Sequence, residues 1–281
     1  MGTGIVTQIR LGISTCPNDT FAFHGILNHA VDLDGLDMQV QLMDVEELNR
    51  GLKAGAFDVA KASFATALRM TDEWVVLPSG SAIGFGVGPV LLSAEPTVPA
   101  HPRVLLPGEG TTAALLYTLL RPDGGDIRHV VFSDIMPALE QGEADLGVCI
   151  HEGRFTYAAR GLHLVEDLGQ RWEDKTGAPL PLGGILARRD LGSDVLSRVQ
   201  SAVRASIQHA IANRDEALTT MRRYAQELDD DVIWSHVDLY VNEWTLALGG
   251  RGRAALDVLS QHGADAGIVG PGARPLEVYG P

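Results

Sequence analysis

Short apolar runs alternate with helical stretches along the first third of the chain. The runs are rich in Val, Ile, Leu and Met and have the length of buried strands, whereas the stretches between them repeat with the period of a helix. This alternation is typical of βαβ units and predicts a mainly parallel sheet, with ligands at the carboxyl ends of its strands. The predicted strands are Gln8–Ser14, Met38–Met43 and Phe57–Ala60, and the predicted helices are Thr20–Ala30, Val45–Ala54 and Phe64–Met70.

A glycine-rich passage at Ser79–Pro89 interrupts this rhythm and leads into the apolar strand Val90–Ser93. We interpret the passage as a crossover, because prolines follow it and a second βα series then begins. In that series we predict strands at Arg103–Leu106, Val130–Phe132 and Leu146–Ile150, and helices at Thr111–Leu120 and Ile135–Gln141.

The last third of the chain is mostly helical. After a polar loop expected at Leu168–Pro181, the strand Gly184–Ala187 returns to the first lobe. A chain that crosses into a second lobe, returns and ends in helices matches the two-lobed type II periplasmic-binding-protein architecture, an α/β fold with a cleft between the lobes. We expect a large lobe of residues 1–92 plus 186–281 and a small lobe of residues 93–185. The helical patterns are Ser193–Asn213, Asp215–Glu227, Asp230–Tyr240 and Arg251–His262.

Charge and composition exclude several classes of function. The 22 Lys and Arg residues are scattered and outnumbered by 36 Asp and Glu, for a net charge of −14, which argues against nucleic acid as a partner. No apolar run approaches the length of a membrane span, and no basic segment precedes an apolar run at the start. We therefore expect a soluble, cytoplasmic protein with a small anionic substrate held in a lined pocket.

The two cysteines and the short motifs do not suggest a metal site. Cys16 and Cys149 are too few for a disulfide framework, and we expect both to be reduced thiols. The sequence has no CxxC or HExxH spacing, so we expect no structural zinc site. Nothing else in the sequence signals a metal or an organic cofactor.

The loop after the first predicted strand carries unusual polar residues, in the run Ser14–Gly25. Asn18 and Asp19 offer an amide and a carboxylate at the expected ligand edge, and Thr20 is a candidate cap for the following helix. A plain turn with a helix cap explains the same residues, so both interpretations stay open.

Two further strand ends carry candidate binding residues. Lys61 and Ser63 end an apolar strand; Lys61 either extends to solvent or offers a cation to a ligand carboxylate, and Ser63 either binds or caps the next helix. Pro107–Thr112 resembles an anion cradle, in which Thr111 and Thr112 stand beside the free N–H groups of a helix start. It lacks the Lys-Ser/Thr pair of a nucleotide-binding loop.

His151 directly follows an apolar strand, again at the ligand edge, and is our candidate general base. Glu152 or Tyr157 could orient its ring. Arg154 either anchors a substrate carboxylate or lies on a solvated helix face. A cysteine acting as nucleophile beside His151 is a weaker alternative, because no familiar Cys–His signature surrounds either thiol.

Together, these segments resemble the 1,4-dihydroxy-6-naphthoate synthase family of the futalosine pathway of menaquinone biosynthesis. The resemblance spans nearly the whole chain, and its most specific parts are the CPNDTF loop and the IHEGRFTY segment. The segments that carry it are Ser14–Gly25, Lys61–Ser63, Gly110–Thr112, Ile150–Tyr157, Leu180–Asp190 and Val232–Val237.

The resemblance implies a lyase that cleaves cyclic dehypoxanthine futalosine to 1,4-dihydroxy-6-naphthoate and dihydroxyacetone, without a cofactor. It also implies roles: His151 is the proton acceptor, Lys61, Ala62 and Ser63 line one side of the substrate site, and Thr112 with Ala113 line the other. The family often has a larger aliphatic residue at the position of Ala62, a difference that concerns pocket shape more than chemistry.

Two rival functions remain at this point. The related chorismate dehydratase shares the fold and an anionic ring substrate, but its loops differ from the CPNDTF loop and the His151 segment. A non-catalytic small-anion binding or sensor protein is the second rival, disfavoured because the sequence has neither a secretion signal nor a helix-turn-helix. The sequence is also compatible with a homodimer and does not decide the oligomeric state.

Overall fold

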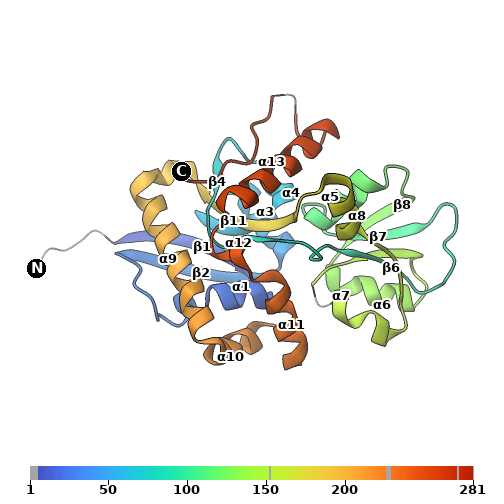
Figure 1. The fold of residues 1–281 in the computed structure, drawn as a ribbon, viewed down its shortest axis with the longest axis horizontal. Helices are drawn as coiled ribbons and strands as arrows, with labels where there is room; N and C mark the ends of the chain where they lie inside the picture. The colour runs from blue at the N-terminus through green and yellow to red at the C-terminus, as the bar shows by residue number, and fades with distance from the viewer. Residues whose placement is uncertain (1–5, 152, 226–228, 271, 281) are drawn as a thin grey trace, which may run out of the picture.

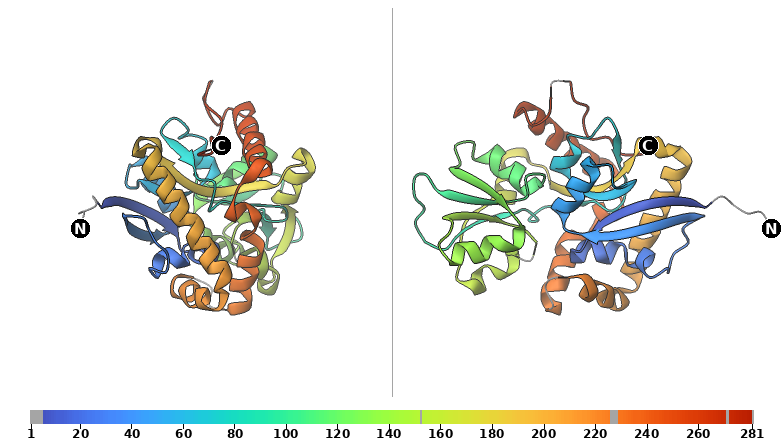
Figure 2. Two further views of the ribbon diagram at one scale, coloured as in Figure 1. Left: turned by 60° about the vertical axis from the view of Figure 1, so that its left-hand side comes forward. Right: turned by 180° about the vertical axis from the view of Figure 1, so that it is seen from behind.

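Two lobes, each built around its own β-sheet, lie side by side in the computed structural model (Figure 1; Figure 2). The structure describes residues 6–151, 153–225, 229–270 and 272–280. The long helix of residues 192–212 lies in front of the sheet that holds the N-terminal strand in Figure 1, and behind that sheet in the right-hand view of Figure 2. This arrangement confirms the predicted two-lobed α/β fold.

The sheet of the first lobe has the order β2-β1-β3-β11-β4, with β5 paired to β11. Strand β1 is parallel to both neighbours, and β11 is antiparallel to β3, β4 and β5. Alternate residues of β1, Ile9, Leu11 and Ile13, are fully buried in a cluster with Val199 and Val203 of helix α9 (Gly192–Ala212), so this face of the sheet faces the core. The strands are β1 (Thr7–Ser14), β2 (Leu36–Met43), β3 (Val59–Ser63), β4 (Trp74–Val76), β5 (Ala82–Gly84) and β11 (Leu180–Arg188).

The first lobe carries most of the helices. Helix α3 begins with the capping box formed by Asp44 and Glu47, whose side chains bind the exposed N–H groups of the helix start. The helices are α1 (Pro17–Ala22), α2 (His24–Leu27), α3 (Val45–Lys53), α4 (Phe64–Ala67), α9 (Gly192–Ala212), α10 (Arg214–Tyr224), α11 (Asp230–Tyr240), α12 (Glu243–Leu246) and α13 (Gly249–Asp265), with the 3₁₀ turn η3 (Arg189–Leu191).

The sheet of the second lobe has the order β10-β6-β9-β7-β8. Strand β7 is parallel to β8 and β9, whereas β6 is antiparallel to β9 and β10. The strands are β6 (Val90–Ser93), β7 (Arg103–Pro107), β8 (Asp126–Val130), β9 (Leu146–Cys149) and β10 (His163–Asp167), and the helices are α5 (Thr112–Leu120), α6 (Ile135–Glu140), α7 (Gly153–Thr156) and α8 (Leu168–Thr176), with 3₁₀ turns η1 (Phe132–Asp134) and η2 (Ala158–Arg160).

The expected loop at Leu168–Pro181 was wrong, because most of it is helix α8. The side chain of Asp167 accepts hydrogen bonds from the backbone N–H groups of Gly169 and Gln170, and this cap starts the helix. Trp172 is 1% exposed and anchors the helix in the core. A single buried aromatic residue in an otherwise polar segment gives a helical periodicity that is too weak to predict a helix from the sequence.

Two other expected elements are shifted. The strand expected at Val130–Phe132 lies earlier, at β8, an edge strand whose exposed polar residues hid it from a search for apolar runs. The helix expected at Thr20–Ala30 begins at Pro17 and breaks at Phe23, with Cys16 as its N-cap. The Thr20 hydroxyl donates to the Cys16 carbonyl from inside the helix, so Thr20 is not the cap.

The pairing of the strands into two sheets places the lobe boundaries a few residues away from the expected ones. Strand β6 pairs entirely within the second sheet, and all of β11 pairs within the first. The chain therefore crosses between lobes at residues 85–89 and 177–179, rather than at 92/93 and 185/186. We propose these two short crossovers as the hinge of the molecule.

The crossovers pass close to helix α8. A Cβ atom added at Gly88 would lie 2.1 Å from the Cα atom of Gly169, so only a glycine allows this contact. The Leu168 N–H also donates to the Pro89 carbonyl at 3.1 Å. The first crossover is thereby held against the second lobe.

We predict that Gly88→Ala lowers the free energy of unfolding by about 1–3 kcal/mol, because backbone atoms must move to admit the methyl group. Urea titration followed by circular dichroism measures the change. The control is Gly250→Ala, where an added Cβ has no atom within 4 Å. Equal stability of the two variants would contradict the packing argument.

Candidate active site

A cavity of about 90 Å³ lies between the lobes, at the carboxyl ends of β1, β3 and β9 and at the start of α5. Helix α11 closes it with His236 and Tyr240. Nine of the ten residues proposed from the sequence line this cavity: Asn18, Asp19, Lys61, Ala62, Ser63, Thr111, Thr112, Ala113 and His151.

A larger hollow of about 550 Å³ adjoins the cavity and shares Val45, Thr111 and Ile150 with its wall. Its remaining walls come from the start of α3 in one lobe and from the ends of β7 and β8 in the other. The hollow is the natural approach to the cavity, because both lobes contribute to it.

Lys61 and Asp19 form a buried ion pair on the first-lobe side of the cavity. The Lys61 Nζ lies 2.5 Å from Asp19 Oδ1, and the two residues are 6% and 2% exposed. The hydroxyl of Ser14 donates to the other carboxylate oxygen at 2.7 Å. Of the two interpretations of Lys61, extension to solvent was wrong, since the ammonium group is buried against the carboxylate.

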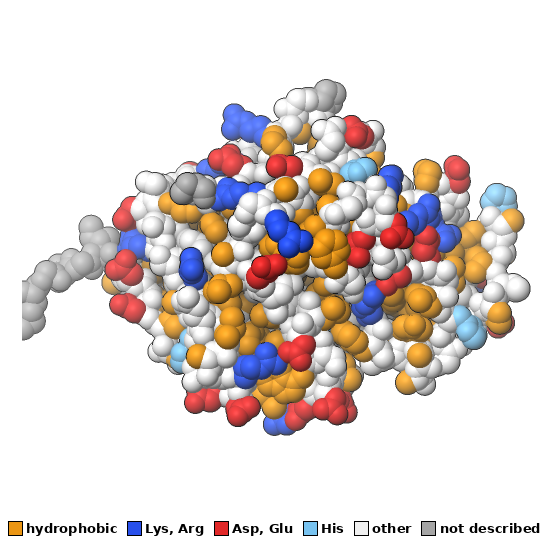
Figure 3. All heavy atoms as spheres, in the orientation of Figure 1, with side chains coloured by type: hydrophobic (Ala, Val, Ile, Leu, Met, Phe, Trp, Pro, Cys, Tyr) orange, Lys and Arg blue, Asp and Glu red, His pale blue; other side chains and the backbone are white. Residues whose placement is uncertain are grey.

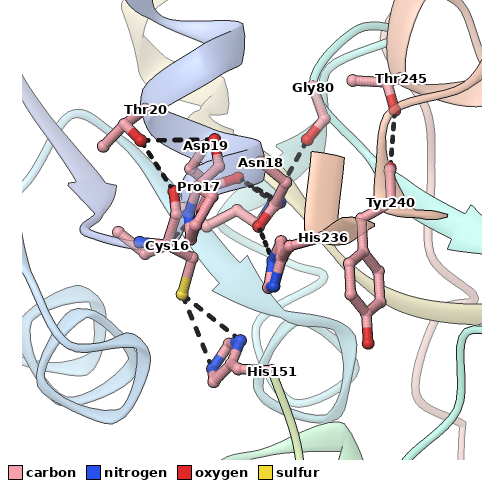
Figure 4. Close-up of polar contacts among 12 residues, drawn as sticks. Cys16, Pro17, Asn18, Asp19, Thr20, Gly80, His151, His236, Tyr240 and Thr245 are labelled. Carbon is pink, nitrogen blue, oxygen red and sulfur yellow. Dashed lines mark hydrogen bonds and ion pairs between the residues drawn. The ribbon is translucent and has the colours of Figure 1, made fainter. Parts of the chain in front are cut away.

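Asn18 connects this ion pair to His236 (Figure 4). The Asn18 Nδ2 donates to Asp19 Oδ1 at 3.0 Å, which fixes the orientation of the amide because a carboxylate can only accept. The Asn18 Oδ1 therefore accepts from His236 Nε2 at 3.0 Å. This bond places the hydrogen of the neutral His236 ring on Nε2.

His236 is 2% exposed and lies on the buried face of α11. Burial first, and then the nearby His151 and Lys61, hold the pKa of His236 well below its usual value of 6.5. The residue is therefore neutral at physiological pH.

His151 follows β9 and meets Cys16 across the cavity (Figure 4). The Cys16 Sγ lies 3.4 Å from Nδ1 and 3.6 Å from Nε2 of the imidazole. The rings of Phe132 and His236 flank it, with centroids at 4.8 and 6.0 Å. Of the two cysteines, Cys16 is thus the one beside the candidate base, while Cys149 is buried in the core.

The backbone of His151 is in the left-handed region, with φ of +55°. A non-glycine residue there costs free energy, and such residues cluster at functional sites where the surrounding structure enforces the conformation. The sharp turn after β9 is what brings the imidazole into the cavity wall.

The hydrogen-bond donors of the site come from a serine and a helix start. Asn49 holds Ser63 from both sides, accepting from its N–H at 3.0 Å and donating to its hydroxyl oxygen at 3.2 Å. This leaves the hydroxyl hydrogen of Ser63 for a ligand. Thr111 caps α5 by accepting from the Ala114 N–H at 3.2 Å.

Thr112 and Ala113 form the first turn of α5, whose backbone N–H groups have no partner inside the helix. The Thr112 hydroxyl donates to the Leu182 carbonyl at 2.6 Å, so this hydroxyl connects the lobes rather than binding a ligand. The N–H groups of the turn, which carry the positive end of the helix dipole, are the donors that an anion or enolate would meet.

Arg154 does not line the cavity, which corrects its assignment as a substrate anchor. Its guanidinium donates to the Gly88 carbonyl at 2.8 Å and to Asp167 at 2.6 Å. Tyr157 packs against the apolar cluster of the second lobe, and Glu152 lies outside the described residues. Neither residue is therefore assigned to the ring of His151.

A group of potential metal ligands in the described part of the chain lies outside the cavity, at His24, His209 and Glu216. Asn28 Nδ2 donates to the His24 carbonyl, which fixes the amide, and the same group lies 3.0 Å from His24 Nδ1. His24 Nδ1 also lies 2.8 Å from Thr220 Oγ1, so this nitrogen already has a hydrogen-bond partner in the protein. The group shares no residue with the cavity wall.

Sequence reasoning missed His236 and Tyr240 as cavity residues. Both lie on the face of α11 that also buries Ile233 and Val237, so the pattern indicated ordinary packing. The available signal was a histidine on an otherwise apolar helix face, within a segment that carries the family resemblance.

Comparison with known proteins identifies the class and then the family. The periplasmic aliphatic sulphonate binding protein of Escherichia coli superposes with a TM-score of 0.64 at 14% identity, covering 98% of this chain and 94% of that one. The fold is therefore that of the periplasmic binding proteins, here with a histidine- and thiol-lined cavity between the lobes. The chain belongs to the menaquinone biosynthesis family, whose sequence pattern matches residues 9–265.

Relatives within this family extend over nearly the whole chain. A Thermus thermophilus protein named 1,4-dihydroxy-6-naphtoate synthase is 43% identical, covering 96% of this chain and 99% of its own. A Streptomyces coelicolor protein of the same name is 40% identical, covering 93% and 94%. A crystal structure from Archaeoglobus fulgidus has a TM-score of 0.88 at 31% identity, covering 93% and 98%. The resemblance inferred from the sequence is confirmed.

We predict that Asp19→Asn lowers the free energy of unfolding by about 3–5 kcal/mol, because it leaves the buried Lys61 ammonium without a counter-charge. The control is Asp194→Asn, which breaks an exposed pair with Arg198 and should change stability by at most about 0.5 kcal/mol. Urea unfolding of both variants at pH 7 checks this. Similar losses in the two variants would argue against the buried pair.

We also predict a pH dependence of stability that depends on His236. Its pKa is lowered in the folded protein, so below about pH 6.5 the unfolded chain binds a proton that the folded chain does not. The contribution of His236 to the free energy of unfolding is thus fully present above about pH 6.5. Below that pH it falls by about 1.4 kcal/mol for each pH unit.

The variant His236→Gln should remove that contribution and flatten the curve between about pH 6.5 and 5. His24, whose pKa is also lowered, chiefly by burial and next by His209, contributes in the same direction, and the variant retains that contribution. Urea titrations at several pH values measure both curves, and parallel curves would disprove the assignment.

Proposed function

We propose that the chain is a lyase that converts cyclic dehypoxanthine futalosine to 1,4-dihydroxy-6-naphthoate and dihydroxyacetone. The observation that carries the proposal is the placement of His151 in one cavity with Ser63 and the start of α5, in a chain 43% identical to a relative with this name. The reaction needs a base and hydrogen-bond donors, and the cavity offers both kinds of group.

The chemistry assigns a role to each side of the cavity. Cleavage of the carbon–carbon bond to the sugar-derived fragment requires a base, and it leaves negative charge on an enolate oxygen. His151 is the proton acceptor. The N–H groups of Thr112 and Ala113 and the hydroxyl of Ser63 stabilise the enolate, and formation of the aromatic ring drives the reaction forward.

The buried first-lobe residues act as support for this chemistry. Lys61 and Asp19 neutralise each other, so the cavity wall beside them is polar but has little net charge. Ala62 and Ala113 are small and leave room for the fused rings. Closure of the lobes about the two crossovers would exclude water from the reacting groups.

The partners and location remain part of the proposal. On the face of the molecule in Figure 3, Lys and Arg side chains are mixed with Asp and Glu and form no continuous basic surface, which supports a small-molecule partner over nucleic acid. No helix in the described ranges has the length and apolar character needed to cross a membrane. Cys16 and Cys149 do not form a disulfide, which fits a reducing cytoplasm. A homodimer stays a prediction.

We predict that His151→Ala abolishes measurable turnover. The value of kcat should fall by about 10²–10⁴-fold or more, because the general base is lost. Ligand binding should survive, since the other cavity walls remain. Mass spectrometry of naphthoate formed from cyclic dehypoxanthine futalosine measures turnover, and a thermal shift with the same compound measures binding.

The control variant is His101→Ala, which changes an exposed histidine outside the cavity and should leave turnover unchanged. Full turnover by the His151 variant would refute the base assignment. Folded wild-type protein that forms no naphthoate would refute the lyase and favour a binding or sensor protein.

A further inference from the structure

His236 has an unused hydrogen-bonding atom at the cavity. Among the described residues, four buried side-chain nitrogen or oxygen atoms have no hydrogen-bond partner, and His236 Nδ1 is one of them. The others are on Ser81, Trp172 and Arg198, none of which lines the cavity. A buried polar atom without a partner costs about 1–3 kcal/mol, so its retention at a ligand cavity calls for a reason.

A chain of hydrogen bonds from Lys61 to His236 determines whether Nδ1 carries a hydrogen. Lys61 holds Asp19, Asp19 holds the amide of Asn18, and Asn18 Oδ1 accepts from His236 Nε2 at 3.0 Å. The hydrogen is therefore on Nε2, and Nδ1 has a free lone pair. Because the ring is neutral, Nδ1 can only accept a hydrogen bond.

We propose that His236 is a further substrate-contacting residue, whose Nδ1 accepts a hydrogen bond from a hydroxyl group of the substrate. The inference rests on the proposed function, in which the substrate carries hydroxyls on its sugar-derived part. The rings of His236 and His151 are nearly parallel at 20°, with centroids 6.0 Å apart, so both histidines can address the same part of one substrate.

The assignment also explains why Asn18, Asp19 and Lys61 line the cavity while their polar groups bind one another. They are positioning residues that fix the tautomer of His236, and His236 touches the substrate. The Nδ1 atom is covered in the free protein, so the contact forms as the lobes and Tyr240 adjust around the ligand.

Two substitutions at position 236 separate this role from a structural one. In His236→Asn, the side-chain oxygen is attached to Cγ, as Nδ1 is in histidine, so it keeps an acceptor there but loses the bond to Asn18. In His236→Gln, the amide nitrogen is at the ε position, so it keeps a donor to Asn18 but loses the δ acceptor.

We expect the Gln variant to keep a thermal midpoint close to that of the wild type and to lose at least about tenfold in kcat/KM, because a substrate hydroxyl is left without its acceptor. The Asn variant should be less stable and yet retain several-fold more kcat/KM than the Gln variant. Steady-state kinetics with cyclic dehypoxanthine futalosine and thermal unfolding measure the two quantities.

Equal kcat/KM values, or more activity in the Gln variant than in the Asn variant, would overturn the proposal and leave His236 a structural residue. If the Asn variant does not fold, the Gln variant decides alone: wild-type kcat/KM overturns the proposal, and a tenfold loss at unchanged stability supports it. Wild-type protein assayed in parallel separates the two hypotheses, since lack of wild-type turnover refutes the lyase function itself.

Discussion

The buried ion pair between Lys61 and Asp19 is the constraint on which the site depends. It joins β3 to helix α1, which follows the neighbouring strand β1, at the point where both strands reach the cavity. Removing two charges from water is costly, and the short contact, with additional hydrogen bonds from Ser14 and Asn18, is what offsets that cost. The pair therefore tolerates little displacement, and it fixes the start of α1, where Cys16 is the N-cap and Asn18 lies in the first turn.

The two histidines of the cavity, His151 and His236, contact the start of α1 from opposite sides. Asn18 sets the tautomer of His236 through one hydrogen bond, and Cys16 lies against the imidazole of His151 from the other lobe. The start of α1, held by the ion pair, thus contacts a second-lobe residue whose backbone is itself strained, with φ of +55°. Rigid support on one side and strain on the other are common where a protein gives up stability for the geometry of a site.

Sequence reasoning recovered the parts of the structure that have a strong local signal. The strand ends at Lys61, Ser63 and His151 were found because the carboxyl ends of parallel strands meet at one edge. Helix α8 and His236 were missed for the opposite reason: a single cap at Asp167 and one polar residue on an apolar helix face are weak local patterns. Whether Lys61 and Arg154 point to a ligand or to another residue depends on contacts across the fold, with Asp19 and with Gly88 and Asp167, that no local pattern contains.

A fold shared with transport proteins can support catalysis because the same closure serves both purposes. A binding protein needs only walls that match its ligand, whereas a lyase also needs a base and hydrogen-bond donors at the reacting atoms. Here His151 and the start of α5 belong to the second lobe, while Ser63 and His236 belong to the first. Residues of both lobes already line this one cavity, so closure about the proposed hinge would exclude water from groups that are in place.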